Sequence, residues 1–304
     1  MKKDLLRILD LADREILSLI ASASTWKKRC GKKNAPRPLI GKSLAMIFQK
    51  ASTRTRVSFE VGMHRLGGHA LFMAPDYTQI GRGEPIRDTA RVLSRYVDAV
   101  MIRTFAHSDA VELAKAASVP VVNGLTDDHH PCQIMAALMT ARERGKDLRK
   151  IRAAFIGDGN NVANSWVEAA HVLGFKLSVA CPSGYEPNAV IVKEAESLGR
   201  GDVRIVRDPR EAARNADVLY TDVWTSMGQE AEGKRRRAVF KDYCIDAQLL
   251  RCAAKDAIVM HCLPAHRGEE ITEDVIEGPR SVVFDEAENR VHVQMAVLEK
   301  LIKH

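Results

Sequence analysis

Short apolar segments alternate along this chain with segments in which apolar residues recur every three or four positions. The apolar segments lie at 43–49, 69–74, 99–104, 120–123, 152–157, 176–180, 203–207, 218–222 and 258–262. Their length is typical of strands, and the pattern between them is typical of amphipathic helices. Because this alternation favours parallel sheets covered by helices, nine strands predict an α/β fold with two doubly wound parallel-sheet domains.

The boundary between the two domains is expected in a polar segment. Residues 141–150 are almost entirely charged or small and follow the helix that Pro131 opens. We therefore expect one domain at 1–145 and a second at 146–304. The closing segment has a helical apolar pattern, and we expect this last helix, about 289–304, to return to the first domain.

Composition and charge exclude several classes of protein. The 304 residues are 46% hydrophobic and 28% charged, as in an ordinary folded protein. The net charge is +7, but the basic residues are scattered, and the cluster at 234–237 stands among acidic residues and predicts a solvated loop. With only 5% aromatic residues, a nucleic-acid surface is not expected. The basic balance suits small anionic substrates.

The cysteines indicate a reducing compartment, and the apolar runs predict no membrane segment. Six cysteines form no C-x-x-C pair, so neither a disulfide framework nor a zinc knuckle is expected. No apolar run reaches 18 residues, and the chain begins with an amphipathic segment rather than an apolar leader. We expect a cytoplasmic protein that does not enter membranes and uses neither a metal nor a cofactor.

The run from Ser52 to Arg56 has the features of a phosphate site. It lies where a predicted strand gives way to a helix, and it combines three hydroxyls with two guanidiniums. The start of a helix adds unpaired N–H groups and the positive end of the macrodipole. An N-cap followed by two solvated arginines is the ordinary alternative.

Other polar residues follow predicted strands, where parallel sheets bind ligands. They are Arg103, residues 129–133, 158–161, 222–228 and 261–264. Each has an ordinary structural explanation when taken singly. A dinucleotide site is not expected, because residues 157–162 keep only two of the three required glycines.

Taken together, the motifs resemble one enzyme family in identity and order. The segments are STRTRVSFE at 52–60, GRGEPIRDTA at 81–90, HPCQ at 130–133, DVWTSMG at 222–228, HCLP at 261–264 and DEAENR at 285–290. They resemble the aspartate/ornithine carbamoyltransferases, and the SMG and HCLP segments resemble the ornithine branch. The resemblance covers about residues 41 to 290.

The resemblance implies transfer of the carbamoyl group of carbamoyl phosphate to the δ-amine of L-ornithine, giving L-citrulline and phosphate, in arginine metabolism and more specifically in its biosynthesis. It implies that the catalytic residues are Arg103, His130, Asp222 and Cys262. Carbamoyl phosphate would be bound by Ser52, Thr53, Arg54, Thr55, Gln79, Arg103, His130, Pro131, Cys132, Gln133, Cys262, Leu263 and Arg290. L-ornithine would be bound by Asn161, Asp222, Ser226 and Met227.

The residue types suit this chemistry. Charge develops on the carbonyl oxygen during attack, so fixed donors such as Arg103, His130 and Thr55 are expected there. The amide oxygen of Gln133 can accept from the carbamoyl NH₂. The δ-amine has a pKa of about 10 and must lose a proton before it attacks. In the resembling family Leu263-Pro264 is a cis bond.

The resemblance also implies a homotrimer, in which Gln79 contributes to a neighbouring subunit's site. Two alternatives stay open at this point. One is a carbamoyltransferase with another amine acceptor, such as putrescine or an N-acylornithine. The other is a non-catalytic anion-binding protein.

Overall fold

The computed structural model describes residues 4–32, 34–74, 83–225 and 230–303 of the chain. Two compact units are present, one of Met1–Ala136 with Glu288–His304 and the other of Ala137–Ala287. The chain leaves the first unit within α5 (Pro131–Glu143) and returns to it within α12 (Val283–Ile302). The last helix therefore contributes most of its length to the first unit.

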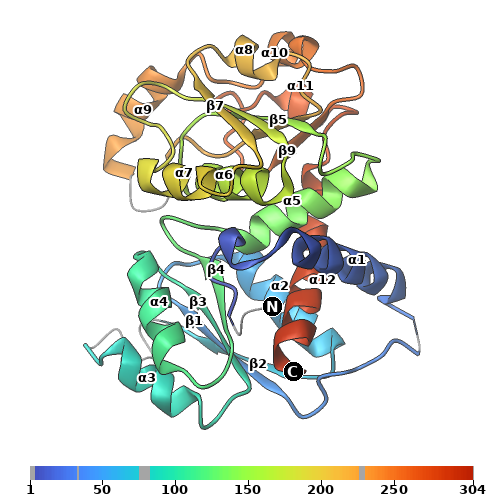
Figure 1. Cartoon of the computed structure of the whole chain (residues 1–304), viewed down its shortest axis with the longest axis vertical. Coiled ribbons are helices and arrows are strands. Elements are labelled where there is room, and N and C mark those ends of the chain that lie inside the picture. Colours follow the sequence, from blue (N-terminus) through green and yellow to red (C-terminus); the bar gives the residue numbers. More distant parts are fainter. Residues whose placement is uncertain (1–3, 33, 75–82, 226–229, 304) are drawn as a thin grey trace. The chain divides into compact units, whose positions relative to one another are not determined.

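The first unit contains a four-stranded parallel sheet in the order β2-β1-β3-β4. Its strands are β1 (Ser43–Phe48), β2 (His69–Met73), β3 (Ala99–Arg103) and β4 (Val121–Leu125). Its other elements are η1 (Ile8–Asp10), α1 (Asp13–Arg29), α2 (Thr53–Arg65), α3 (Ile86–Leu93), α4 (His107–Ala116) and the parts of α5 and α12 named above (Figure 1).

The second unit contains a five-stranded parallel sheet in the order β7-β6-β5-β8-β9. Its strands are β5 (Arg152–Ile156), β6 (Lys176–Ala180), β7 (Asp202–Val206), β8 (Val218–Thr221) and β9 (Ile258–His261). Its helices are α6 (Asn161–Leu173), α7 (Ala189–Glu196), α8 (Pro209–Ala213), η4 (Glu230–Glu232), α9 (Gly233–Phe240), α10 (Ala247–Cys252) and α11 (Glu273–Ile276).

Burial explains why the central strands are continuous apolar runs. Every residue of β3 is buried, as is every residue of β1 after Ser43, because helices cover both faces of a doubly wound sheet. In the second unit β8 and β9 are buried throughout. The nine predicted strands and the predicted fold class are confirmed, with strand ends that differ by one or two residues.

The strand orders fix where each unit can bind a ligand. In the first sheet the chain reverses its direction of winding between β1 and β3, and in the second sheet between β5 and β8. Loops diverge at such a switch point and leave a crevice beyond the carboxyl ends of the two strands. The run at 52–56 follows β1 and Arg103 ends β3, whereas residues 158–161 follow β5 and Asp222 follows β8.

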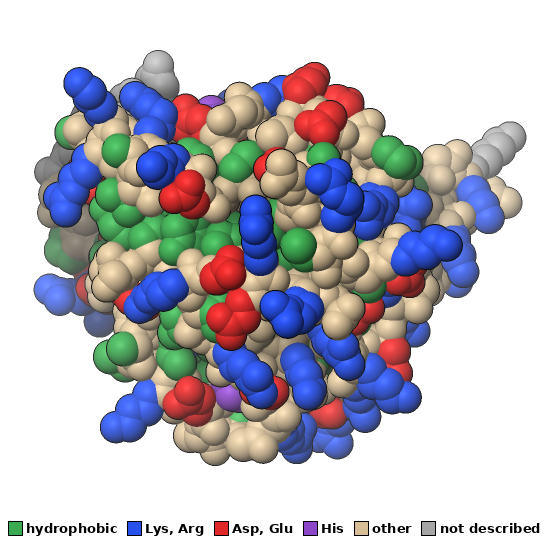
Figure 2. Space-filling model, turned by 90° about the horizontal axis from the view of Figure 1, so that it is seen from above, with side chains coloured by type: hydrophobic (Ala, Val, Ile, Leu, Met, Phe, Trp, Pro, Cys, Tyr) green, Lys and Arg blue, Asp and Glu red, His purple; other side chains and the backbone are tan. Residues whose placement is uncertain are grey.

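Charges of both signs are mixed on the face of the molecule drawn in Figure 2. On the face drawn in Figure 2, Lys and Arg side chains are spread widely and Asp and Glu side chains lie among them. Within the part of the chain that the structure describes, no helix has the length and apolar character needed to cross a membrane.

Candidate active site

The start of α2 is built as an anion site in the first unit. Ser52 is the N-cap residue, and its hydroxyl oxygen accepts the N–H of Thr55 at 3.2 Å. The Thr55 side chain is fully buried and its hydroxyl oxygen accepts a hydrogen bond from Arg290 Nη2 at 2.9 Å. The first N–H groups of a helix have no acceptor within the helix, and the macrodipole adds positive potential there. Arg290 of α12 therefore adds a third positive element beside the run predicted from sequence.

The two arginines of this run differ in their surroundings. Arg56 donates to Glu60 Oε1 at 3.0 Å, and its guanidinium lies 3.8 Å from the centre of the Phe72 ring. Arg54 is partly buried in the first turn of α2. Of the two guanidiniums, the sequence analysis assigned Arg54 to the anion, and the structure gives Arg56 other partners.

Arg103 and His130 bring polar groups to the same switch point. Arg103 is the last residue of β3, is 7% exposed and is paired in register with Phe48 of β1. His130 is buried immediately before α5, and its carbonyl accepts the N–H of Gln133 at 3.1 Å. Burial lowers the pKa of His130 well below its ordinary value, and the positive charges of Arg290 and Arg103 lower it further. At neutral pH His130 is therefore an uncharged imidazole, which can donate a hydrogen bond to a carbonyl oxygen.

The start of α5 positions the next three candidates. Pro131 is the first residue of this helix, a position that tolerates proline because its missing N–H is not needed. The thiol of Cys132 donates to the carbonyl of Asn123 at 3.6 Å, and burial raises its pKa to about 12. Only the backbone of Cys132 is therefore available for a ligand. Gln133 is 1% exposed in the first turn.

Lys50 is a cation at this strand end that the sequence prediction missed. It follows β1, is 7% exposed and forms an ion pair with Asp127. Its ammonium also lies 4.4 Å from the centre of the Phe105 ring. The available signal was its place directly after a buried strand and before the phosphate run.

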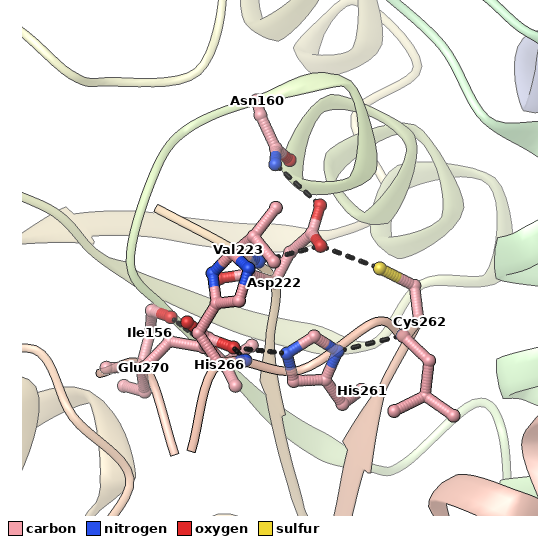
Figure 3. A network of polar contacts seen from close by, with 10 residues as sticks. Ile156, Asn160, Asp222, Val223, His261, Cys262, His266 and Glu270 are labelled. Atoms are coloured by element: carbon pink, nitrogen blue, oxygen red, sulfur yellow. Dashed lines mark hydrogen bonds and ion pairs between the residues drawn. The ribbon is translucent and has the colours of Figure 1, made fainter. Parts of the chain in front are cut away.

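In the second unit the carboxylate of Asp222 is held at three points (Figure 3). One oxygen accepts the N–H of Val223 at 2.8 Å and the thiol of Cys262 at 2.7 Å, and the other accepts Asn160 Nδ2 at 2.7 Å. The side-chain oxygen of Asn160 caps α6 by accepting the N–H groups of Val162 and Ala163. Asp222 is thus a fixed, 7% exposed anion at the second switch point, suited to an ammonium group.

Asn160 was also missed, because the prediction chose its neighbour Asn161. Asn161 is the first residue of α6 and is partly exposed. The signal for Asn160 was its residue type, since Asn is a preferred N-cap. Asn160 orients the anion, while Asn161 stays a candidate for contact with a ligand.

The segment that carries Cys262 and Leu263 is fixed by a buried histidine. His261 Nδ1 accepts the N–H of Leu263 at 2.9 Å, so the ring proton lies on Nε2, which donates to Glu270 Oε1 at 3.0 Å. Leu263 has φ 56°, a left-handed conformation uncommon for a side chain of this size. The Leu263–Pro264 bond is cis.

A buried ion pair links the ends of β5 and β8. Arg236 is 4% exposed, pairs with Asp158 and donates through Nε to the carbonyl of Trp224. Its guanidinium also lies 4.8 Å from the centre of the Tyr185 ring. The residues predicted as a solvated loop at 234–237 lie instead in α9, and the packing of that helix buries Arg236, whereas Lys234, Arg235 and Arg237 are exposed as expected.

Asp158 itself is close to its titration point at neutral pH. Burial raises its pKa to about 7, the Arg236 charge opposes that rise, and the Asp222 charge adds to it. A partly protonated carboxyl beside Asp222 keeps the net negative charge of this strand end moderate.

Some predicted residues lie outside the described part of the chain, namely Gln79, Ser226 and Met227. Within the described residues, two groups have the spacing of metal ligands: Asp222 with His261 and Cys262, and His266 with Glu269 and Glu270. Both ring nitrogens of His261 already have partners, which disfavours the first group. The expected absence of a metal stays a prediction.

Comparisons with known proteins point to one family over almost the whole chain. A model described as aspartate/ornithine carbamoyltransferase, carbamoyl-P binding domain, matches residues 3–143, and one described as the Asp/Orn binding domain of the same family matches residues 149–301. A curated ornithine carbamoyltransferase of Methanoculleus marisnigri is 57% identical over 302 residues, which are 99% of this chain and 97% of that protein. One of Geobacter metallireducens is 55% identical over 291 residues, which are 95% of this chain and 96% of that protein.

Solved structures give the same result. The ornithine carbamoyltransferase of Pyrococcus furiosus has a TM-score of 0.92 at 51% identity, covering 97% of this chain and 95% of that chain. A structure titled anabolic ornithine carbamoyltransferase, from Campylobacter jejuni, has a TM-score of 0.92 at 40% identity, covering 98% of both chains.

Proposed function

The chain belongs to the aspartate/ornithine carbamoyltransferase family, and we propose that its two units divide the two substrates of that reaction between them. It is a carbamoyltransferase that moves the carbamoyl group of carbamoyl phosphate to the δ-amine of L-ornithine, giving L-citrulline and phosphate. The geometry of each unit supports a definite role for its residues in this reaction.

In the first unit the phosphate lies at the start of α2. Hydroxyl, guanidinium and N–H donors are supplied there by Ser52, Thr53, Arg54 and Thr55. Arg290, which donates to the Thr55 hydroxyl, adds a positive charge beside them. Arg103 and the uncharged His130 donate to the carbamoyl oxygen, on which charge develops during attack. Gln133 accepts from the carbamoyl NH₂ and so distinguishes this substrate from simple phosphate esters. Burial and the charges of Arg290 and Arg103 keep His130 neutral, and a neutral imidazole still has one N–H to donate.

In the second unit Asp222 receives the α-ammonium of ornithine, and Asn161, Ser226 and Met227 receive the rest of the amino-acid head. The observation that carries this assignment is the fixed carboxylate of Asp222, held by Asn160 and Cys262. Such an anion fits the α-ammonium of a free amino acid, which an N-acylornithine lacks. Putrescine has a second ammonium but lacks the α-carboxylate that Asn161, Ser226 and Met227 receive. We therefore favour ornithine over both alternative acceptors.

Cys262 and the carbonyl of Leu263 position the δ-amine and remove it from water, which favours its neutral form. The resemblance also gives them contact with carbamoyl phosphate. Cys262 needs no covalent role, because a neutral amine is already a sufficient nucleophile. A non-catalytic anion-binding protein would have no use for this second set of groups.

The enzyme assembles as a trimer in which Gln79 reaches a neighbouring subunit's site. An edge strand of the first unit supports an interface: β2 lies at the edge of its sheet, and Leu71 and Phe72 on it are 43% and 37% exposed. An uncovered edge strand with apolar side chains is usually paired or covered. Sedimentation should give three chains per particle, and an active monomer would contradict this proposal.

The reaction belongs to arginine biosynthesis in the cytoplasm. The relative from Campylobacter jejuni is titled anabolic, which supports the biosynthetic direction. Deletion of the gene should make growth depend on supplied citrulline or arginine, and growth without either would contradict this role.

One assay tests the function. Citrulline formation is measured with carbamoyl phosphate and, in parallel, ornithine, putrescine, aspartate and N-acetylornithine. Ornithine should give the highest kcat/KM by a wide margin, and Asp222→Asn should abolish that preference. Comparable turnover of putrescine or N-acetylornithine would overturn the acceptor assignment.

A further inference from the structure

Cys30 lies where three helices of the first unit meet. It is the residue directly after α1, and its Sγ is 3.7 Å from His292 Nδ1 and 4.0 Å from Met295 Sδ, both on α12. Arg65, the last residue of α2, donates to the same sulfur from 3.6 Å. Figure 1 shows α1 in dark blue, α2 in light blue and α12 in red. The thiol therefore has a proton acceptor and a cation as direct neighbours.

His292 is oriented so that it can take the thiol proton. Its Nε2 lies 3.4 Å from Glu288 Oε1, so the ring proton is on Nε2 and Nδ1 faces Cys30 as an acceptor. Burial lowers the pKa of His292, the Glu288 carboxylate opposes this, and the charges of Lys27 and Arg65 lower it further. The ring is therefore neutral near pH 7, as a base must be. A cysteine beside a histidine and a guanidinium is the usual setting of a reactive thiol.

The other cysteines have different surroundings. Burial raises the pKa of Cys132 to about 12, that of Cys181 to about 11 and that of Cys244 to about 12. Cys181 also has an arginine at 3.7 Å but is fully buried. Cys252 is partly exposed like Cys30, but its thiol donates to the Gln248 carbonyl of its own helix.

We propose that Cys30 exchanges with small disulfides and that the resulting adduct weakens phosphate binding at the start of α2. The thiol proton passes to His292 Nδ1, and Sγ attacks one sulfur of the disulfide R–S–S–R. The S–S bond breaks, the mixed disulfide Cys30–S–S–R forms, and the leaving thiolate takes the proton from His292 as R–SH. Arg65 stabilises the thiolate during this step.

The link to the phosphate site runs through α12. His292 is two residues beyond Arg290, whose guanidinium donates to Thr55. There is little free space between α2 and α12, because a Cβ on Gly62 would lie 3.3 Å from Met295 Cγ. An added group on Cys30 competes with Met295 and His292 for the space around Sγ, since protein interiors are close-packed. A shift of these two α12 residues moves Arg290 and weakens its hydrogen bond to Thr55. This part of the proposal rests on the proposed role of Thr55 in phosphate binding.

The exchange is tested on the full-length chain without substrates. The protein is incubated with oxidised glutathione, and adducts are followed by intact-mass measurement and peptide mapping. Cys30 should be modified first, and His292→Asn should slow that adduct about tenfold or more because the base is lost. Cys252→Ser, which removes another partly exposed thiol outside the proposed site, should leave the rate unchanged. A first adduct on any other cysteine, or an unchanged rate in His292→Asn, would overturn the proposal.

The consequence is tested with inorganic phosphate as the probe. Calorimetry compares the affinity of the Cys30 adduct, of the same sample after reduction with dithiothreitol, and of a Cys30→Ser sample exposed to oxidised glutathione. The adduct should bind phosphate about tenfold more weakly, a change of about 1.4 kcal/mol, and reduction should restore binding. Unchanged affinity would overturn the coupling. The rate of disulfide exchange at Cys30 is measured without substrate, so it does not depend on whether the proposed function is correct.

Discussion

Replacing Glu270 by alanine tests whether the segment carrying Cys262 and Leu263 depends on one buried carboxylate. A single oxygen of Glu270 accepts the Nε2–H of His261 at 3.0 Å and the N–H of His266 at 2.5 Å. The side chains of His261 and Glu270 are both fully buried. Removal of Glu270 leaves the ring N–H and the His266 N–H without this acceptor.

The expected loss of stability follows from these contacts. Hydrogen bonds to a charged group contribute about 1.5–3 kcal/mol each, so two give about 3–6 kcal/mol. Release of the carboxylate from a buried environment recovers part of this, and we expect a net loss of about 3 kcal/mol. Carbamoyl transfer should fall by more than the loss of unfolding free energy alone would cause. The reason is that His261 can then rotate and no longer accept the N–H of Leu263.

The matched control is Glu269→Ala. Glu269 is the neighbouring residue, and its carboxylate is 3.9 Å from Arg237 in a solvent-exposed pair, which is typically worth about 0.5 kcal/mol. Urea unfolding is followed by tryptophan fluorescence, which reports both units, because Trp166 and Trp224 lie in the second unit and Trp26 lies in the first. Hydrogen exchange at the Leu263 amide gives a local measure. If Glu270→Ala destabilises the protein no more than Glu269→Ala does, or leaves the Leu263 amide equally protected, the reasoning is refuted.

Three further predictions concern the anion site, the acceptor site and acid stability. Arg54→Ala should weaken carbamoyl phosphate binding about 30-fold or more in calorimetry. Arg56→Ala should not, because the Arg56 guanidinium donates to Glu60; equal losses of affinity in the two variants would contradict the assignment of the anion to Arg54. Asn160→Ser keeps a capping oxygen but removes the amide that donates to Asp222, so the KM for ornithine should rise about tenfold with carbamoyl phosphate affinity unchanged. Burial lowers the pKa of His107 to about 4, and the His129 charge adds to this. As the pH falls, the unfolded chain therefore takes up this proton before the folded chain does. The free energy of unfolding should fall between about pH 6.5 and about pH 4, by about 3 kcal/mol at most. His107→Gln should lessen that loss, and an identical acid profile in the variant would count against it.

The sequence was sufficient for the fold because the central strands carry an unusually clear signal. β1 and β3 are buried on both faces, so each is a continuous apolar run, and the loops after them hold the polar motifs. The order of strands in a sheet cannot be read from such runs. The switch points came only from the pairing of β1 with β3 and of β5 with β8, and they put the motifs after those four strands at the edges where such sheets usually bind ligands.

Side-chain direction within a motif was harder to predict. Asn160 and Asn161 are identical in type, and only the cap geometry of α6 decides that Asn160 faces Asp222. Arg236 lay in a cluster whose charge pattern indicated solvent, yet the packing of α9 buries it against Asp158. The spacing of Arg236 and Phe240, four residues apart, was the available sign of a helix face directed inward.

The chemical state of the two buried histidines depends on residues far away in the chain. His130 is neutral because it is buried and because Arg103 and Arg290 face it, and Arg290 arrives from the last helix. The His261 tautomer is set by Leu263 on one nitrogen and Glu270 on the other. A motif can therefore name a histidine as part of a site, but whether its ring donates or accepts is decided by the fold. In the proposed reaction the neutral His130 donates an N–H to the carbamoyl oxygen, whereas His261, with both nitrogens engaged, is confined to holding the backbone of Leu263.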